Sequence, residues 1–346
     1  MYESMNRIGK ELTEREREIL MQIVRLYILK ASPIGSRTLS KYLEGVLNLS
    51  PATIRNVMAD LEELEYITHP HTSAGRIPTD KGYRFYVDSI NDYIQVNETE
   101  INKVRENLSS ADTSNILRDT SKILGMLSNY LSIVKIPKIV DCKVVKLDII
   151  KLSSNRLLIV LALDSNIVRT ISLEVDYEID DKHLFQINQY INEKISNKTI
   201  KFIKENFHNL LSDYPSKNIP LLRLFTESLD DIFTTKNEEQ LLVAGTQNLL
   251  QYPEFESKER IKSIIELIEN QDIVIHLLDE YEEPGNVKVL IGSEMNDSIL
   301  DEYALVLSSY KLGSSYGSIG LIGPKRMNYP KIISLVKAVS AALSST

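Results

Sequence analysis

Residues 50–88 constrain the fold of this chain more than any other stretch, because they combine a capped helix, a tight hairpin and a second helix. Ser50 followed by Pro51 is typical of a helix start: the serine hydroxyl accepts a hydrogen bond from an unpaired backbone amide, and proline has no amide hydrogen to leave unpaired. Apolar residues then recur at helical spacing, at Ile54, Val57, Met58, Leu61 and Leu64. The pattern predicts an amphipathic helix whose apolar face turns inward.

The outward face of this helix begins with small and polar side chains. Arg55 and Asn56 carry paired hydrogen-bonding groups that fit base edges in the major groove, and Ala52 lets the helix backbone come close to a surface. Ser50 and Thr53 lie beside them. We therefore interpret the start of the helix as a candidate DNA-reading surface, although helix-turn-helix units also serve as protein-binding modules.

The flanking residues predict a winged helix-turn-helix. Residues 66–78 alternate around a Ser-Ala-Gly turn and predict a short hairpin with Arg76 at its base. Upstream, Thr13 and Glu16 form a capping box for a long first helix, and residues 32–43 predict a second. This layout is that of a helix-turn-helix with a supporting helix. DNA contacts are expected at Ser36, Arg37, Thr38, Lys41, Ser50, Ala52, Thr53, Arg55, Asn56 and Arg76.

The distribution of charge supports this interpretation better than the net charge does. A net charge of −8 argues against DNA binding, because affinity for the duplex depends on neutralised phosphates. Residues 1–90, however, carry 12 basic and 12 acidic residues, so the acidic excess lies in the rest of the chain. Within residues 25–59 five basic residues stand against Glu44 alone. The candidate DNA face is therefore positive in an acidic chain.

Residues 50–88, together with "PIGSRTLSKYL" before them and "GSIGLIGPKRMNYPKIISLV" at 317–336, resemble the heat-inducible transcription repressors of the HrcA family. The resemblance extends over the whole length. It implies a homodimer that binds an inverted-repeat operator in double-stranded DNA upstream of chaperone operons, releases it on heat stress and depends on a chaperonin for activity. It also implies an α+β fold, in which a winged helix-turn-helix domain precedes a GAF-like α/β domain that holds an inserted, mainly helical dimerisation domain.

The remaining residues are assigned to domains by their periodicity. Three strand-like runs within residues 143–175 are joined by turns too short for parallel neighbours, so they predict an antiparallel meander. Helical spacing follows, and strands are expected again at 272–278, in "NVKVLIG" and in "GSIGLIG", before a final helix. We expect a DNA-binding domain at 1–90, a helical linker at 91–135, a GAF-like domain at 136–180 and 255–346, and an inserted dimerisation domain at 181–254.

The dimer seam is expected on the apolar face of the inserted helices. Ile187, Ile191 and Ile195 lie four residues apart and share one helix face. The alternative is that they fill the core of their own domain.

Patterns typical of enzymes are weak. Residues 313–317 match a G-x-S-x-G motif around Ser315, but no histidine follows it, so we interpret them as a glycine-rich turn. His69 and His71 lack a nearby third ligand for a metal ion. We therefore expect no catalysis, no cofactor and no metal site.

The cellular location is expected to be the cytoplasm. Cys142 has no second cysteine with which to form an internal disulfide, and neither a secretory signal nor an apolar run long enough for a membrane span is evident. Because GAF-like domains often hold small molecules, a metabolite-sensing winged-helix regulator is the alternative to a heat-controlled repressor.

Overall fold

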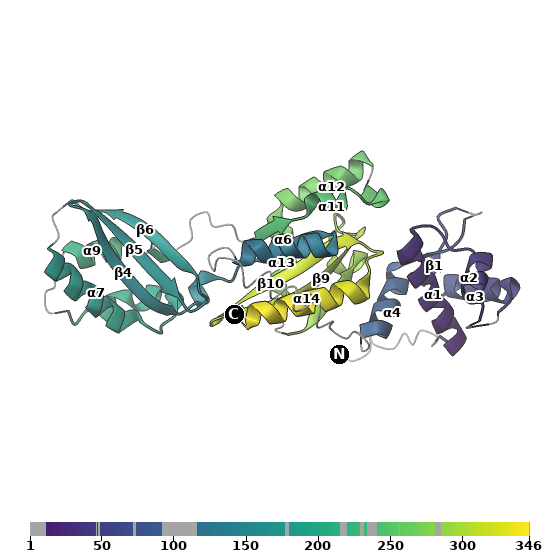
Figure 1. Cartoon of the computed structure of the whole chain (residues 1–346), viewed down its shortest axis with the longest axis horizontal. Helices are drawn as coiled ribbons and strands as arrows, with labels where there is room; N and C mark the ends of the chain where they lie inside the picture. The colour runs from purple at the N-terminus through teal and green to yellow at the C-terminus, as the bar shows by residue number, and fades with distance from the viewer. Residues whose placement is uncertain are drawn as a thin grey trace, which may run out of the picture.

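The computed structural model describes residues 12–45, 47, 49–71, 74–91, 116–176, 180–214, 220–228, 232–233, 241–255, 257–280 and 285–345. The N-terminal domain and an inserted block lie at opposite ends of a central domain, so the molecule is elongated (Figure 1). Helices and antiparallel sheets occupy separate layers in it, which confirms the predicted α+β class.

The N-terminal domain is a winged helix-turn-helix, as predicted. Its elements are α1 (Glu14–Lys30), α2 (Ser36–Tyr42), α3 (Pro51–Glu63), β1 (Ile67–Thr68), β2 (Ile77–Pro78) and α4 (Asp80–Asn91). The capping box at the start of α1 is present, since the backbone amide of Thr13 donates to Glu16 Oε2 at 2.6 Å. The wing is anchored by Arg76, whose backbone exchanges two 2.9 Å hydrogen bonds with Ile34 just before α2.

The anchoring of the wing explains a glycine in the hairpin. A Cβ atom on Gly75 would lie 2.6 Å from the carbonyl carbon of Ile34, too close for any side chain. Glycine is therefore required where the wing passes the loop before α2.

The central domain contains a sheet with the strand order β7-β3-β10-β9-β8, in which every neighbouring pair is antiparallel. Helices α6 and α14 pack on one face and α12 and α13 on the other, which is the layered arrangement expected of a GAF-like domain. Its elements are α6 (Ile116–Ser128), β3 (Leu131–Lys135), β7 (Leu241–Ala244), α11 (Thr246–Leu249), η2 (Pro253–Phe255), α12 (Lys258–Glu269), α13 (Gln271–Glu280), β8 (Val287–Ile291), η3 (Gly292–Met295), β9 (Tyr303–Leu312), β10 (Ser315–Pro324) and α14 (Tyr329–Ser344).

The inserted block has its own sheet and its own core. Its elements are η1 (Ile139–Asp141), β4 (Val144–Ser153), β5 (Arg156–Leu163), β6 (Val168–Glu174), α7 (Asp181–Ile195), α8 (Ile200–Leu211) and α9 (Pro220–Glu227). The antiparallel meander β4-β5-β6 is present as predicted. Its inner face, however, packs on α7 and α8 and not in the central sheet.

The expected boundaries of the GAF-like domain are wrong for this reason. Residues 144–174 belong with the inserted helices, whereas the central sheet takes β3 from the expected linker and β7 from the expected insert. Short hairpins look alike in any antiparallel sheet, so their pattern does not reveal which sheet they join. Residues 92–115 of the expected helical linker lie outside the described residues.

The strand expected at 272–278 is the helix α13. Its buried residues Val274, Leu277 and Leu278 follow helical spacing, and a short apolar run is ambiguous between strand and helix. The strands expected in "NVKVLIG" and "GSIGLIG" and the final helix are confirmed as β8, β10 and α14.

Candidate nucleic-acid interface

The first turns of α3 present the side chains that were expected to read bases. Ala52, Arg55 and Asn56 are exposed, whereas Ile54 is fully buried. Ser50 caps the helix: its Oγ accepts a hydrogen bond from the Thr53 amide at 3.1 Å. Thr53 is half-buried, and its hydroxyl lies 2.9 Å from Ser50 Oγ, so these two hydroxyls stabilise the helix start as well as facing outward.

Helix α2 places further polar side chains beside that tip. Arg37, Thr38 and Lys41 are exposed and Ser36 is half-buried. The turn between the two helices is held by Ser40, whose hydroxyl donates to the Leu49 carbonyl at 2.9 Å. This bond fixes how the exposed face of α2 lies against the start of α3.

Basic side chains gather at the start of α3 and on α2, whereas acidic ones lie at the far end of α3, which places the candidate interface at the start of α3. Among the described residues, none of Arg37, Lys41 and Arg55 forms an ion pair with a carboxylate, so their charges are available to phosphates. The exposed carboxylate of Glu63 lies at the other end of α3. The positive N-terminal end of the helix dipole adds to the attraction for phosphate at the start of α3.

Arg76 differs from the other expected contacts, because it is held inside the domain. Its Nη2 lies 2.7 Å from Glu62 Oε2, and Glu62 also binds Nδ1 of His69. Although burial alone would raise it, His69 and Arg76 together lower the pKa of the Glu62 carboxyl. Glu62 therefore ties both sides of the wing to α3, a role that its place in the sequence does not reveal because the wing residues reach it only in the folded domain.

The G-x-S-x-G motif does not have the geometry of a nucleophile elbow. It forms the turn between β9 and β10 rather than a strand-to-helix turn, and Ser315 is buried with its hydroxyl donating to the Lys138 carbonyl at 3.1 Å.

Within the described ranges no group of three or more His, Cys, Asp or Glu side chains is arranged to hold a metal ion. In the same residues, no helix is both long and apolar enough to cross a membrane.

The three-helix core, the capped and exposed tip of α3 and the wing that packs against it define a winged helix-turn-helix DNA-binding protein. Two family models match the chain: "Winged helix-turn-helix transcription repressor, HrcA DNA-binding" over residues 11–91, and "HrcA protein C terminal domain" over residues 114–333. The chain therefore belongs to the HrcA family of heat-inducible transcription repressors.

Individual relatives match over nearly the full length. The chain is 35% identical to the heat-inducible transcription repressor HrcA of Chlorobium phaeobacteroides (strain BS1), covering 96% of this chain and 98% of the relative. It is 34% identical to the protein of the same name from Chlorobaculum tepidum, covering 97% of each. A crystal structure of a hypothetical protein superimposes with a TM-score of 0.66 at 26% identity, covering 97% of this chain and 98% of that one.

Proposed function

We propose that this repressor acts in the cytoplasm as a homodimer that binds an inverted-repeat operator of chaperone genes and releases it on heat stress. The observation that carries the proposal is the exposed polar tip at the start of α3, on a domain whose other helices position it for a major groove. One such domain reads only a few base pairs, and an inverted repeat mirrors the two-fold symmetry of a dimer.

At the operator, Arg55 and Asn56 read base edges, while Arg37 and Lys41 hold phosphates from α2. Each bidentate base contact supplies about 1–3 kcal/mol of discrimination. Arg76 reaches a phosphate only if it exchanges its ion pair with Glu62 for that contact. Its contribution to binding is therefore smaller than that of the two cations on α2, which have no ion pair to give up among the described residues.

The dimer seam needs a different location from the one expected. Ile187, Ile191 and Ile195 are each 0% exposed in the core of the inserted block, where they pack against β4 and β5, so they fill their own domain. The outer face of the meander instead exposes large apolar side chains among polar ones such as Lys146 and Glu174: Val168 is 63% exposed, Leu152 53% and Ile150 46%. Exposed faces of antiparallel sheets are normally polar, so we place the two-fold seam on this outer face.

Loosening of a marginally stable fold explains release on heating. A loss of about 1.4 kcal/mol changes the ratio of folded to unfolded protein tenfold, and the stability of a domain is only about 5–15 kcal/mol. A chaperonin that refolds the repressor would hold it active, and unfolded proteins that occupy the chaperonin during stress would free the operons. This proposal rests on the family and on the division of the chain into separate cores.

The test is a selection of duplexes from a random pool by the purified chain, followed by affinity measurements on the selected sequence and on random DNA. Arg55→Ala and Asn56→Ala are expected to weaken binding to the selected duplex by about 1–3 kcal/mol and to change binding to random DNA much less. Arg223→Ala, at an exposed arginine on α9, is the matched control for loss of a charge. Equal losses on both kinds of DNA would refute the base-reading assignment.

A further inference from the structure

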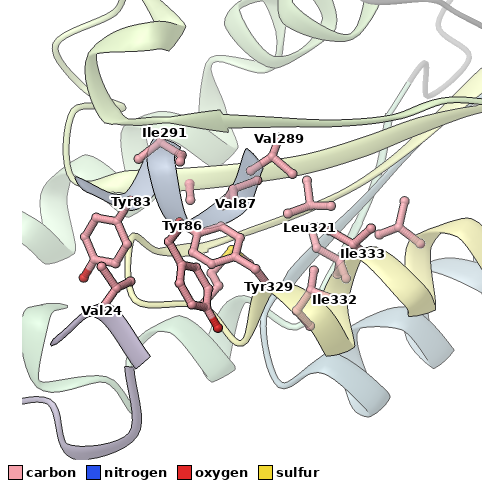
Figure 2. Packing of buried hydrophobic residues seen from close by; sticks show 14 of the residues in the cluster. Val24, Tyr83, Tyr86, Val87, Val289, Ile291, Leu321, Tyr329, Ile332 and Ile333 are labelled. Atoms are coloured by element: carbon pink, nitrogen blue, oxygen red, sulfur yellow. The ribbon is translucent and has the colours of Figure 1, made fainter. Parts of the chain in front are cut away.

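Helix α4 belongs to the winged-helix domain but is also packed into the central domain. Tyr83, Tyr86 and Val87 are all at least nine-tenths buried, and they lie against α14 and β8 (Figure 2). The ring of Tyr329, at the start of α14, lies 6.3 Å from that of Tyr83 and 6.4 Å from that of Tyr86. One continuous apolar core therefore joins the two domains.

Two ion pairs flank these aromatic rings. Arg84 donates hydrogen bonds to both carboxylate oxygens of Glu294, and the bond from its Nε is 2.8 Å long. It also donates to the Val289 carbonyl at 2.6 Å. Asp80 binds Lys325 at 2.6 Å and accepts from the amide of Ser293 at 3.1 Å. Such contacts are directional, unlike apolar packing alone, so they select one orientation of the two domains.

The backbone beside these pairs is shaped for the contact. Gly292 has φ +50, and a Cβ atom there would lie 2.3 Å from Asp80 Oδ2. Only glycine combines this left-handed conformation with so close an approach of α4. We call the residues Asp80, Tyr83, Arg84, Tyr86, Gly292, Glu294, Lys325 and Tyr329 the α4 seam.

We propose that the α4 seam determines which half-site spacing the repressor accepts, by fixing the direction in which each reading helix points from the dimer body. The proposal rests on the dimeric function proposed above. Adding one base pair between half-sites rotates the second about 34° around the duplex and moves it about 3.4 Å along the axis. A rigidly held domain cannot follow that displacement, whereas a domain on a loose tether can.

The expected size of the effect follows from avidity. Engaging the second half-site strengthens binding by about 10²–10⁴, and this gain is lost when geometry forbids simultaneous engagement. The wild-type protein should therefore lose about a hundredfold in affinity when the spacing of its selected inverted repeat is changed by two base pairs. A protein with an opened seam should bind the whole spacing series within about tenfold.

The experiment uses the full chain and duplexes that carry the selected repeat with spacings changed by one, two and five base pairs, together with a single half-site. Glu294→Gln combined with Lys325→Gln removes the charged partner of Arg84 and of Asp80 across the seam, while net charge and the DNA-reading face stay the same. The control is Lys262→Gln combined with Glu266→Gln, an exposed pair 3.3 Å apart on α12 that removes the same charges away from the seam.

Unchanged half-site affinity with lost discrimination between spacings, in the seam variant and not in the control, supports the proposal. Unchanged discrimination in a seam variant that binds the half-site normally overturns it. If the double variant loses half-site binding as well, Gly292→Asn replaces it in the spacing experiment, with the same supporting and overturning results. Asparagine tolerates the left-handed conformation while its Cβ displaces Asp80. A wild-type protein without preference for the repeat over the half-site would instead refute the proposed function.

Discussion

A pair of substitutions in the inserted block separates the two possible dimer seams. Val168 is 63% exposed on the outer sheet face, and Ile191 is 0% exposed in the core. Val168→Asp should change the free energy of unfolding of the protomer by no more than about 0.5 kcal/mol, as at most surface positions. Ile191→Ala should lower it by about 2–5 kcal/mol, because it removes buried methyl groups and leaves a cavity.

For the dissociation constant of the dimer, the order is reversed: Val168→Asp has the larger effect and Ile191→Ala the smaller. A two-fold interface repeats each substitution, so Val168→Asp places two carboxylates in the seam, each replacing an apolar side chain opposite Ala162 on the neighbouring strand. At a cost of at least about 1 kcal/mol each, the dissociation constant rises about thirtyfold or more. Ile191→Ala should leave the dimer constant nearly unchanged under conditions in which the protomer stays folded.

Sedimentation at a series of concentrations measures the dissociation constant, and thermal unfolding in the same buffer measures stability. Val168→Thr is the matched control, since it keeps the shape of the side chain without a charge. A Val168→Asp protein that dimerises like the wild type would refute the outer-face seam. An Ile191→Ala protein that dissociates without loss of stability would restore the expected seam on α7.

The interface and the heat response give further predictions. Arg37→Ala and Lys41→Ala should each reduce the slope of log affinity against log salt by about one, and Arg76→Ala by less; equal reductions in all three would show that the ion pair of Arg76 does not restrain it. Because the folded-state pKa of Glu62 is lowered, its contribution to stability is present above the ordinary carboxyl pKa and is lost as pH falls through the lowered value; Glu62→Gln should remove this part of the acid dependence in a pH series of unfolding measurements. Operator occupancy of the protein alone should fall on heating and be restored by chaperonin; full occupancy through the heat-shock range, with release by a low-molecular-weight extract at ordinary temperature, would favour a metabolite sensor.

The winged helix could be predicted from the sequence because local signals determine it. The hydroxyls of Thr13 and Ser50 cap their helices as their positions predict, and the outward residues of α3 follow directly from its apolar spacing. Periodicity shows which face of a helix is covered but not what covers it. Ile187 and its neighbours were therefore assigned to a dimer, although a sheet of the same chain covers them.

Pairing between distant segments could not be predicted. Strands β3 and β7 are short, and their register, with Ser132 opposite Ala244, depends on residues far apart in the chain. The roles of Glu62 and Arg84 likewise depend on the wing folding back on α3 and on α4 reaching the central domain. Charged residues on helix surfaces are usually solvated, so nothing local distinguishes those that join two domains.

The position of the inserted block has a consequence for how such a chain can change over time. Lys135 and Leu241 are paired neighbours on β3 and β7, so the whole block leaves and re-enters the sheet at a single point, where an ordinary hairpin would have a short turn. The entropy of closing a loop grows only with the logarithm of its length, which makes a folded domain tolerable in such a turn. The inserted block can therefore be exchanged or changed in shape as a loop can, while the winged helix-turn-helix domain at the other end of the molecule stays unaltered (Figure 1).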